Sequence, residues 1–213
     1  MQKDSSLAAP FKCPLTNCRD NISTSLLLSH FLKAHQHEDD CVDCKEVQES
    51  EKTSLMVTVS SDFLERDKNV CLGILTYKMN IDQPHSNVLL SPAFENFENH
   101  LPILIMACRA NYIKMYDEQA DFIDSDADFL AVWLLAPETG AKQKLFATVT
   151  FHDEEFTKSQ SSLINVRSAS SSQDVQDFID SETDFLTVNS GFLNDISSEG
   201  RIFIEVSINE ILV

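Results

Sequence analysis

The sequence predicts a mainly β protein, in which a small Cys2His2-type zinc finger precedes an antiparallel β-sandwich. Two cysteines and two histidines near the start of the chain have the spacing of zinc-finger ligands. From residue 55 onward, short apolar runs are separated by Asp, Asn, Ser, Pro and Gly, as in chains built from short strands. No long helical segment lies between these runs, whereas a parallel sheet would need crossover helices.

The finger is expected within residues 1–37, from Phe11 to His35. Four residues separate the two cysteines, four separate the two histidines, and eleven lie between the pairs. A turn carrying Pro14 would bring the thiols together, and a helix from about Ser23 to His35 would bring the imidazoles to the same point. Zinc would contribute on the order of 10 kcal/mol to so short a module. The predicted metal ligands are Cys13, Cys18, His30 and His35.

A small apolar core would complete the finger, and its predicted members are Phe11, Ile22, Leu27 and Phe31. The alternative is a chance spacing in a chain with six cysteines. Docking into a DNA major groove does not follow from the match, because the loop between the ligand pairs is one residue shorter than in DNA-reading fingers.

An acidic linker is expected over residues 38–54, which are polar and lack apolar periodicity. Within it, Cys41 and Cys44 form a Cys-x2-Cys pair, and His37 lies nearby. These residues could begin a second metal site, although no fourth ligand follows at a usual spacing. The alternative is a pair of exposed thiols that oxidise in vitro.

Charge and hydropathy exclude several classes of function. The formal net charge of −18 disfavours nucleic acid and anionic membranes as partners. Residues 1–37 carry a small positive balance, which leaves a local RNA or DNA contact open. No apolar run is long enough for a membrane helix, and the first residues do not read as a signal peptide. We therefore expect an intracellular protein, cytoplasmic or nuclear, whose cysteines are thiols or metal ligands.

The sandwich is expected over residues 55–213. In its last run, Ile204, Val206 and Ile208 alternate with polar residues, as in a strand with one solvent-exposed face. The candidate strands cover residues 55–64, 70–79, 88–90, 101–115, 129–136, 144–152, 162–167, 185–188 and 201–211.

A Ser-rich stretch runs from Ser159 to Ser172. Its composition predicts a mobile loop open to phosphorylation, although residues 162–167 within it are also a candidate strand.

An internal repeat joins two parts of the sandwich. The twelve residues from Asp121 to Val132 recur from Asp177 to Val188 with nine identities. Each copy is expected to form a tight acidic turn that leads into a strand. A calcium loop is the alternative, since carboxylates at alternate positions could bind a hard cation, but neither copy has the glycine and terminal glutamate of an EF-hand.

The last strands resemble those of TRAF-like (MATH) sandwiches, including the seven-in-absentia substrate-binding domain. The resemblance is carried by residues 142–151, by Gly191-Phe-Leu-Asn-Asp and by the run from Arg201 to Ile208. Proteins of this family also carry a zinc module directly before the sandwich. The resemblance therefore implies an adaptor linked to ubiquitin-ligase assemblies. There is no RING, which would need eight Cys and His ligands. As a whole the chain also resembles an insect-expanded family of unassigned function with a short finger and a β-rich body.

We do not expect an enzyme. The sequence has no nucleophile elbow, phosphate loop, dinucleotide fingerprint or His-Glu-x-x-His motif, and it contains only four glycines. We read His152, with Asp153 and Glu154, as a solvated strand exit, and Cys71, Cys108 and Trp133 as buried residues.

The leading hypothesis is a non-catalytic, zinc-binding adaptor whose partners are proteins, including extended or basic peptides attracted by its acidic surface. The rival hypothesis is a nucleic-acid-associated regulatory protein whose finger contacts RNA or DNA.

Overall fold

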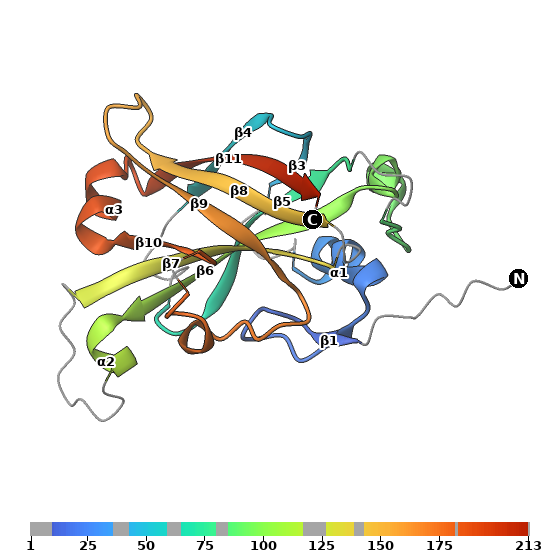
Figure 1. Cartoon of the computed structure of the whole chain (residues 1–213), viewed down its shortest axis with the longest axis horizontal. Helices are drawn as coiled ribbons and strands as arrows, with labels where there is room; N and C mark the ends of the chain where they lie inside the picture. Colours follow the sequence, from blue (N-terminus) through green and yellow to red (C-terminus); the bar gives the residue numbers. More distant parts are fainter. Residues whose placement is uncertain are drawn as a thin grey trace, which may run out of the picture.

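The computed structural model describes residues 10–35, 43–58, 65–79, 85–116, 127–138, 143–181 and 183–212. These residues form three layers (Figure 1). An outer sheet contains β4 (Lys52–Thr58), β8 (Gln143–His152), β9 (Ser159–Ser168) and β11 (Arg201–Leu212). A central sheet contains β3 (Cys44–Val47), β5 (Asn69–Tyr77), β6 (Leu101–Asn111), β7 (Asp128–Ala136) and β10 (Leu186–Asn189). The finger and the 169–185 segment form the third layer, which covers the far face of the central sheet.

The remaining elements are short. The finger contains β1 (Phe11–Lys12), β2 (Asn21–Ile22), η1 (Thr24–Leu26) and α1 (Leu27–Ala34). Between the strands lie η2 (Pro92–Phe97), α2 (Tyr112–Tyr116), η4 (Val175–Asp177) and α3 (Ser190–Ile196). None of the described helices has the length and hydropathy needed to cross a membrane.

The two sheets form one nearly closed ladder in the order β3-β5-β6-β7-β9-β8-β11-β4, with β10 paired to β7. Strand β9 joins the sheets, since Ser159–Asn165 pair with β8 and Val166–Ser168 pair with β7. The two end strands also meet, because Lys45 Nζ of β3 donates to the Ser54 carbonyl of β4 at 2.6 Å. The prediction of a mainly β protein is confirmed.

The prediction of a purely antiparallel arrangement is wrong for two strand pairs. Strand β3 runs parallel to β5, and the end of β9 runs parallel to β7. Between β3 and β5, the chain passes through β4, which belongs to the outer sheet. Strand β5 therefore returns to the central sheet beside β3 and runs in the same direction as β3. In the second pair, β9 bends out of the outer sheet at its carboxyl end and meets β7 there.

The main core lies between the two sheets. The predicted alternation in β11 is confirmed, because Ile202, Ile204, Val206 and Ile208 are all buried while the residues between them are more exposed. In β8, Leu145, Ala147, Val149 and Phe151 are buried on the same side of the outer sheet. They pack with alternate residues of β6 and β7 in one apolar cluster.

The central strands β6 and β7 are buried on both faces, which explains their nearly unbroken apolar sequences. One face packs on the outer sheet and the other on the third layer. Strand β6 ends at Asn111 rather than at residue 115, because the Asn111 Oδ1 atom accepts hydrogen bonds from the Ile113 and Lys114 amides and starts α2.

Three segments differ from their predicted structure. The expected linker contains β3 and the start of β4, because Val47 is buried and the strand backbone bonds to β5. Residues 88–90 form no strand, since the Val88 amide donates to the Ser25 carbonyl of the finger. Residues 159–168 of the predicted Ser-rich loop are β9, in which Ile164 is buried and Ser159 and Ser161 are exposed.

Candidate metal centre

The first two predicted ligands lie in the turn between β1 and β2. The Cys13 amide donates to the Asp20 carbonyl at 2.9 Å, and the Cys18 amide donates to the Leu15 carbonyl at 3.1 Å. These bonds fold residues 13–20 back on themselves, so both thiols face the same point. The paired strands β1 and β2, joined at Phe11 and Ile22, hold the base of this turn.

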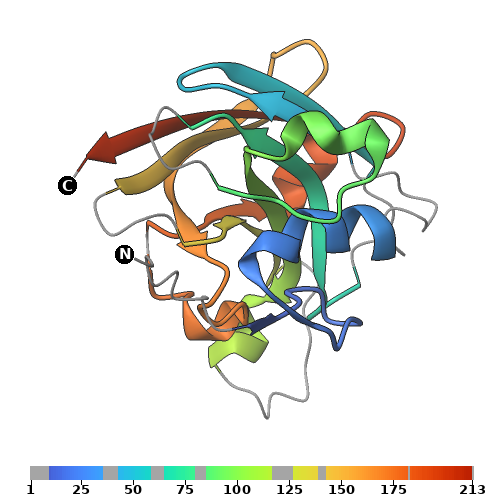
Figure 2. The same ribbon diagram turned by 90° about the vertical axis from the view of Figure 1, so that its right-hand side faces the viewer.

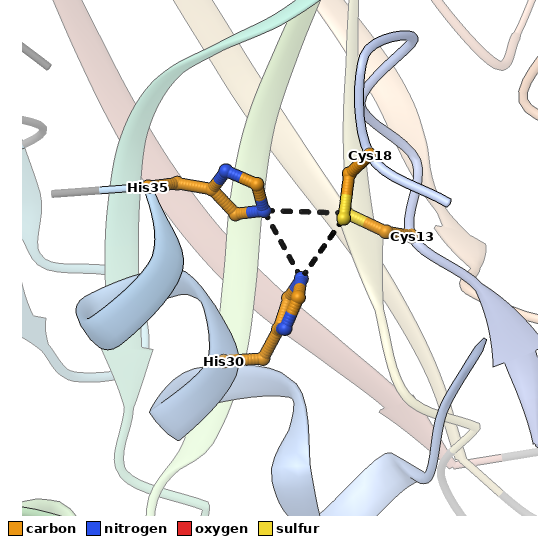
Figure 3. Close-up of side chains that lie close together, drawn as sticks. All are labelled: Cys13, Cys18, His30 and His35. Atoms are coloured by element: carbon orange, nitrogen blue, oxygen red, sulfur yellow. Dashed lines mark hydrogen bonds between the residues drawn. The ribbon is translucent and has the colours of Figure 1, made fainter. Parts of the chain in front are cut away.

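The other two predicted ligands come from the end of α1. His30 is helical, whereas His35 caps the helix at φ −123° and ψ 1°, with its amide bonded to the Phe31 carbonyl. Residues five apart on a regular helix would point in different directions, because each residue turns the helix by about 100°. The non-helical backbone at His35 returns its ring to the side of His30 (Figure 3).

The four ligand atoms are gathered at one point and lie within 4.8 Å of one another. Cys13 Sγ lies 3.6 Å from His35 Nε2, and Cys18 Sγ lies 3.6 Å from His30 Nε2. The two Nε2 atoms are 3.0 Å apart. Metal–sulfur bonds of about 2.3 Å and metal–nitrogen bonds of about 2.0 Å in a tetrahedron would separate S and N by ~3.5 Å. The Cys2His2 group can therefore hold a metal ion.

Burial controls the protonation of this cluster. Burial raises the pKa of the Cys13 thiol to about 12, and the neighbouring Cys18 and Asp20 act in the same direction. Burial also lowers the pKa of His30, while the Asp20 carboxylate opposes that shift. The imidazole is thus kept in its neutral, metal-binding form. The Cys13 thiol would lose its proton only to a cation, so metal binding would release a proton.

Asp20 supports the cluster from outside. Its Oδ2 atom lies 3.9 Å from His30 Nδ1, the ring nitrogen opposite the one that faces the ligand group. Carboxylates commonly orient metal-binding histidines from this side. Asp20 is not among the residues predicted from the sequence, and its position two residues after Cys18 was the available signal.

The finger is fixed to the body of the protein through its apolar side. The four predicted core residues are all buried, and Leu28 and Leu32 join them. Together they pack in one cluster with Cys71, Ile74, Leu104 and Met106 of the central sheet. In Figure 2, α1 lies across the strands of the central sheet. The helix face that DNA-reading fingers present to a major groove is not free here.

Asn69, at the start of β5, links the turn that carries Cys13 and Cys18 to the rest of the chain. Its backbone N–H donates a hydrogen bond to Thr16 Oγ1 of the turn at 2.8 Å. Its side-chain Nδ2 donates to the Pro14 carbonyl at 3.1 Å and to the Gln173 carbonyl at 2.9 Å. Sequence reasoning missed this residue, because its partners lie more than fifty positions away on either side.

The second candidate metal site is only partly described. His37 and Cys41 lie outside the described residues, whereas Cys44 lies in β3. Burial raises the pKa of the Cys44 thiol to about 12, and Asp43 adds to this effect. Within the described ranges, the Cys13 group alone brings three or more potential ligands together.

The acidic repeat is described mainly in its second copy, since residues 121–126 of the first lie outside the described ranges. In the second copy, Asp184 Oδ2 accepts from Arg167 Nη1 at 3.0 Å, and Asp177 accepts from Ser172. Phe178 and Phe185 are buried against Trp133 and its neighbours. These carboxylates bind side chains of the protein, as expected of a structural turn.

His152, Asp153, Cys71 and Cys108 are each held by local hydrogen bonds. His152 is buried and stacked between Phe156 and Phe203, and its Nδ1 donates to the Asp153 carbonyl at 2.7 Å. The Asp153 carboxylate instead accepts from Thr157 and from the Lys158 amide. Burial raises the pKa values of Cys71 and Cys108 to about 12, so both are held as thiols.

Comparison with known proteins gives a family but no function. The family model described as "Domain of unknown function (DUF4729)" matches residues 12–199, and the chain belongs to this family. No curated protein matches the chain.

Proposed function

We propose that this member of the DUF4729 family binds one zinc ion as a structural element and recognises protein partners without catalysing a reaction. The observation that carries the zinc assignment is the gathering of two sulfur and two nitrogen ligand atoms within 4.8 Å of one another, with two S–N distances of 3.6 Å. Two thiolates and two imidazoles are the donor set that zinc prefers. Four protein ligands would leave no open coordination position for a substrate, which favours a structural ion.

The position of the finger favours protein recognition over nucleic-acid binding. Leu27, Leu28, Phe31 and Leu32 are buried, so only the last turn of α1 is exposed. In that turn, Lys33 Nζ donates to the Leu89 carbonyl at 2.6 Å. The net charge of −18 further opposes a polyanionic ligand. The resemblance to TRAF-like sandwiches agrees with an adaptor role, and we extend the proposal to ubiquitin-ligase assemblies on that resemblance alone.

The metal assignment is tested by elemental analysis of protein purified without added zinc. We expect one zinc per chain, and its loss in Cys13→Ser. Cys71→Ser is the matched control, because Cys71 is an equally buried thiol that donates to the Gly73 carbonyl rather than facing the cluster. Another metal in the parent protein, or zinc retained in Cys13→Ser, would overturn the assignment.

Partner recognition is tested separately, by selecting random peptides on the zinc-loaded chain and measuring oligonucleotide binding in parallel. We expect enriched peptides and no oligonucleotide affinity at physiological salt. Oligonucleotide binding with a steep salt dependence, together with no enriched peptide, would support the nucleic-acid hypothesis instead.

A further inference from the structure

A cleft of about 1160 Å³ opens beside the metal centre. One wall is the metal-binding turn, residues 10–19, and the other is the 169–176 part of the 169–185 segment. The ends of β5 and β6 and the helix α2 form its base. We call this space the knuckle cleft. It is larger than the roughly 300–1,000 Å³ of most small-molecule pockets, which favours a polypeptide segment as its occupant.

Both walls of the knuckle cleft are held in place before any ligand arrives. Asn69 bonds to the Pro14 carbonyl of one wall and to the Gln173 carbonyl of the other. The Gln173 side chain accepts from Trp133 Nε1 at 2.9 Å and donates to the Ser171 carbonyl at 2.7 Å. A preformed cleft costs a ligand less ordering free energy than a loop that must close on it.

The cleft offers apolar side chains between positive charges. Leu15 and Met115 are partly exposed and line it. Lys12, Arg19 and Lys114 also line it, and none of them forms an ion pair within the residues that the structure describes. Most of the other described cations do pair with carboxylates, namely Lys45, Lys52, Arg66, Lys68, Arg109, Lys158 and Arg167.

Two carboxylates also line the cleft and reduce its positive charge. Asp174 is engaged as the cap of η4, where it accepts from the Gln176 amide at 3.1 Å. Asp67 lies at the base. The local balance is still positive, on a chain whose net charge is −18. More distant carboxylates are screened beyond about 8 Å at physiological salt, so the charges that line the cleft, three cations against two carboxylates, determine the field at contact.

From this pattern we infer that the knuckle cleft binds an extended peptide of a partner protein, with acidic residues on either side of an apolar one. The apolar side chain packs against Leu15 and Met115, and the carboxylates meet Lys12, Arg19 and Lys114. The inference rests on the proposed function and assigns its site and the chemistry of the partner. It replaces the expected preference for basic peptides, because three cations and two carboxylates line this cleft and leave its local charge balance positive.

The test is fluorescence anisotropy with the zinc-loaded full chain. The probe is a labelled short peptide with a central Leu flanked by Glu on both sides, and the comparison peptides carry Gln or Lys in place of Glu. We expect the Glu peptide to bind most tightly and to weaken as salt is raised. Equal binding of the Glu and Gln peptides, or tighter binding of the Lys peptide, would overturn the inference.

Charge-reversal variants locate the site. The triple variant Lys12→Glu, Arg19→Glu, Lys114→Glu is expected to weaken the Glu peptide at least about tenfold. The matched control is Lys78→Glu, Lys144→Glu, Arg201→Glu, which makes the same charge change at three exposed cations outside the cleft. We expect this control to change binding by less than about threefold. Equal losses of affinity for the Glu peptide in both triple variants would show an effect of net charge alone and would contradict the assignment of the peptide to the knuckle cleft.

Failure of this inference can be told from failure of the proposed function. Zinc content and circular dichroism establish that the cleft variant is folded. If peptides from the random selection bind the cleft variant as tightly as the parent, partner recognition stands and the knuckle cleft is not its site. If no peptide is enriched and the Glu probe does not bind, both proposals are wrong.

Discussion

Asp128, the first residue of β7, is a buried carboxylate that accepts hydrogen bonds from three side chains. Its Oδ2 atom accepts from Arg66 Nη2 at 2.6 Å and from Arg109 Nε at 3.0 Å, while Oδ1 accepts from Asn111 Nδ2 at 2.6 Å. The side chain is 1 % exposed. Asn111 also starts α2, so this network fixes the base of the knuckle cleft.

Asp128→Asn is expected to lower the free energy of unfolding by about 3 kcal/mol, because two guanidinium groups lose their charge partner. Urea unfolding at neutral pH measures this loss in the free energy of unfolding. The control is Glu205→Gln, which removes the partner of the exposed Lys52 and should cost less than about 1 kcal/mol. A loss for Asp128→Asn no larger than that of the control would contradict this account.

The difference in the free energy of unfolding between the parent and Asp128→Asn depends on pH in a predictable direction. Burial alone raises the pKa of Asp128, but hydrogen bonds from Arg66 and Asn111 and the charges of Arg66 and Arg109 outweigh burial and hold the pKa below its ordinary value. A lowered carboxyl pKa stabilises the folded state above the unfolded pKa of about 3.9. The advantage of the parent over Asp128→Asn should therefore be constant at neutral pH and shrink below about pH 4. An advantage that grows on acidification would contradict it.

At the scale of elements, β5 depends on a glycine at its bulge. The register between β5 and β6 shifts between Cys71 and Gly73. A Cβ atom at Gly73 would lie 2.6 Å from Leu55 Cδ2 of β4, closer than carbon atoms can approach. This glycine lets the central sheet and the outer sheet come together where the ladder nearly closes.

Gly73→Ala is expected to destabilise the protein by about 1–3 kcal/mol through overpacking. The double variant Gly73→Ala, Leu55→Ala should lose less than the sum of the two single variants, because the new methyl group enters the space that Leu55 leaves. Gly191→Ala is the control, since its Cβ would meet only Asn189 Oδ1 at 3.4 Å. Thermal unfolding of the four variants measures the coupling, and strict additivity would contradict the contact.

The elements that the sequence could predict are those with a local pattern. The alternation of Ile204, Val206 and Ile208 predicts β11, and the spacing of Cys13, Cys18, His30 and His35 predicts the ligand group, because both depend on neighbours along the chain. Strand β3 was missed, since its four residues contain only one deeply buried side chain and gain their partners from β5.

Features built from distant residues left no such pattern. Asp128 and Arg66 are sixty-two positions apart, and Asn69 and Gln173 are one hundred and four apart. Nothing in the residues around Asn69 distinguishes it from an ordinary polar strand start. The knuckle cleft could not be predicted for the same reason, because its walls come from opposite ends of the chain.

At the scale of the whole molecule, the finger and the sheets share one apolar cluster. Phe31 and Leu32 of α1 belong to the same cluster as Trp133 of β7. Trp133 is the chain's single tryptophan and is fully buried. Its fluorescence therefore reports on the central sheet beneath the third layer. Trp133 is far in sequence from the four predicted metal ligands, which lie between Cys13 and His35.

Removal of zinc by a chelator is expected to lower the unfolding temperature of the whole protein by roughly 10 °C or more, because ligands that bind only the folded state stabilise it. Trp133 fluorescence and far-ultraviolet circular dichroism should report a single coincident transition. A Trp133 transition that does not move on chelation would show that the finger unfolds independently of the sheets. Cys13→Ser should behave as the chelated parent does.

The place of β11 in the outer sheet has a consequence for biosynthesis. It lies between β8 and β4, and its pairing with β4 joins Arg201 to Thr58 and Ile202 to Val57. During translation, β4 and β8 would leave the ribosome before β11. Their edges that pair with β11 would therefore stay unpaired until β11 has been synthesised. Such nascent edges promote aggregation and recruit chaperones. Because β11 follows both of its partners along the chain, the outer sheet is expected to close only after β11 has been translated.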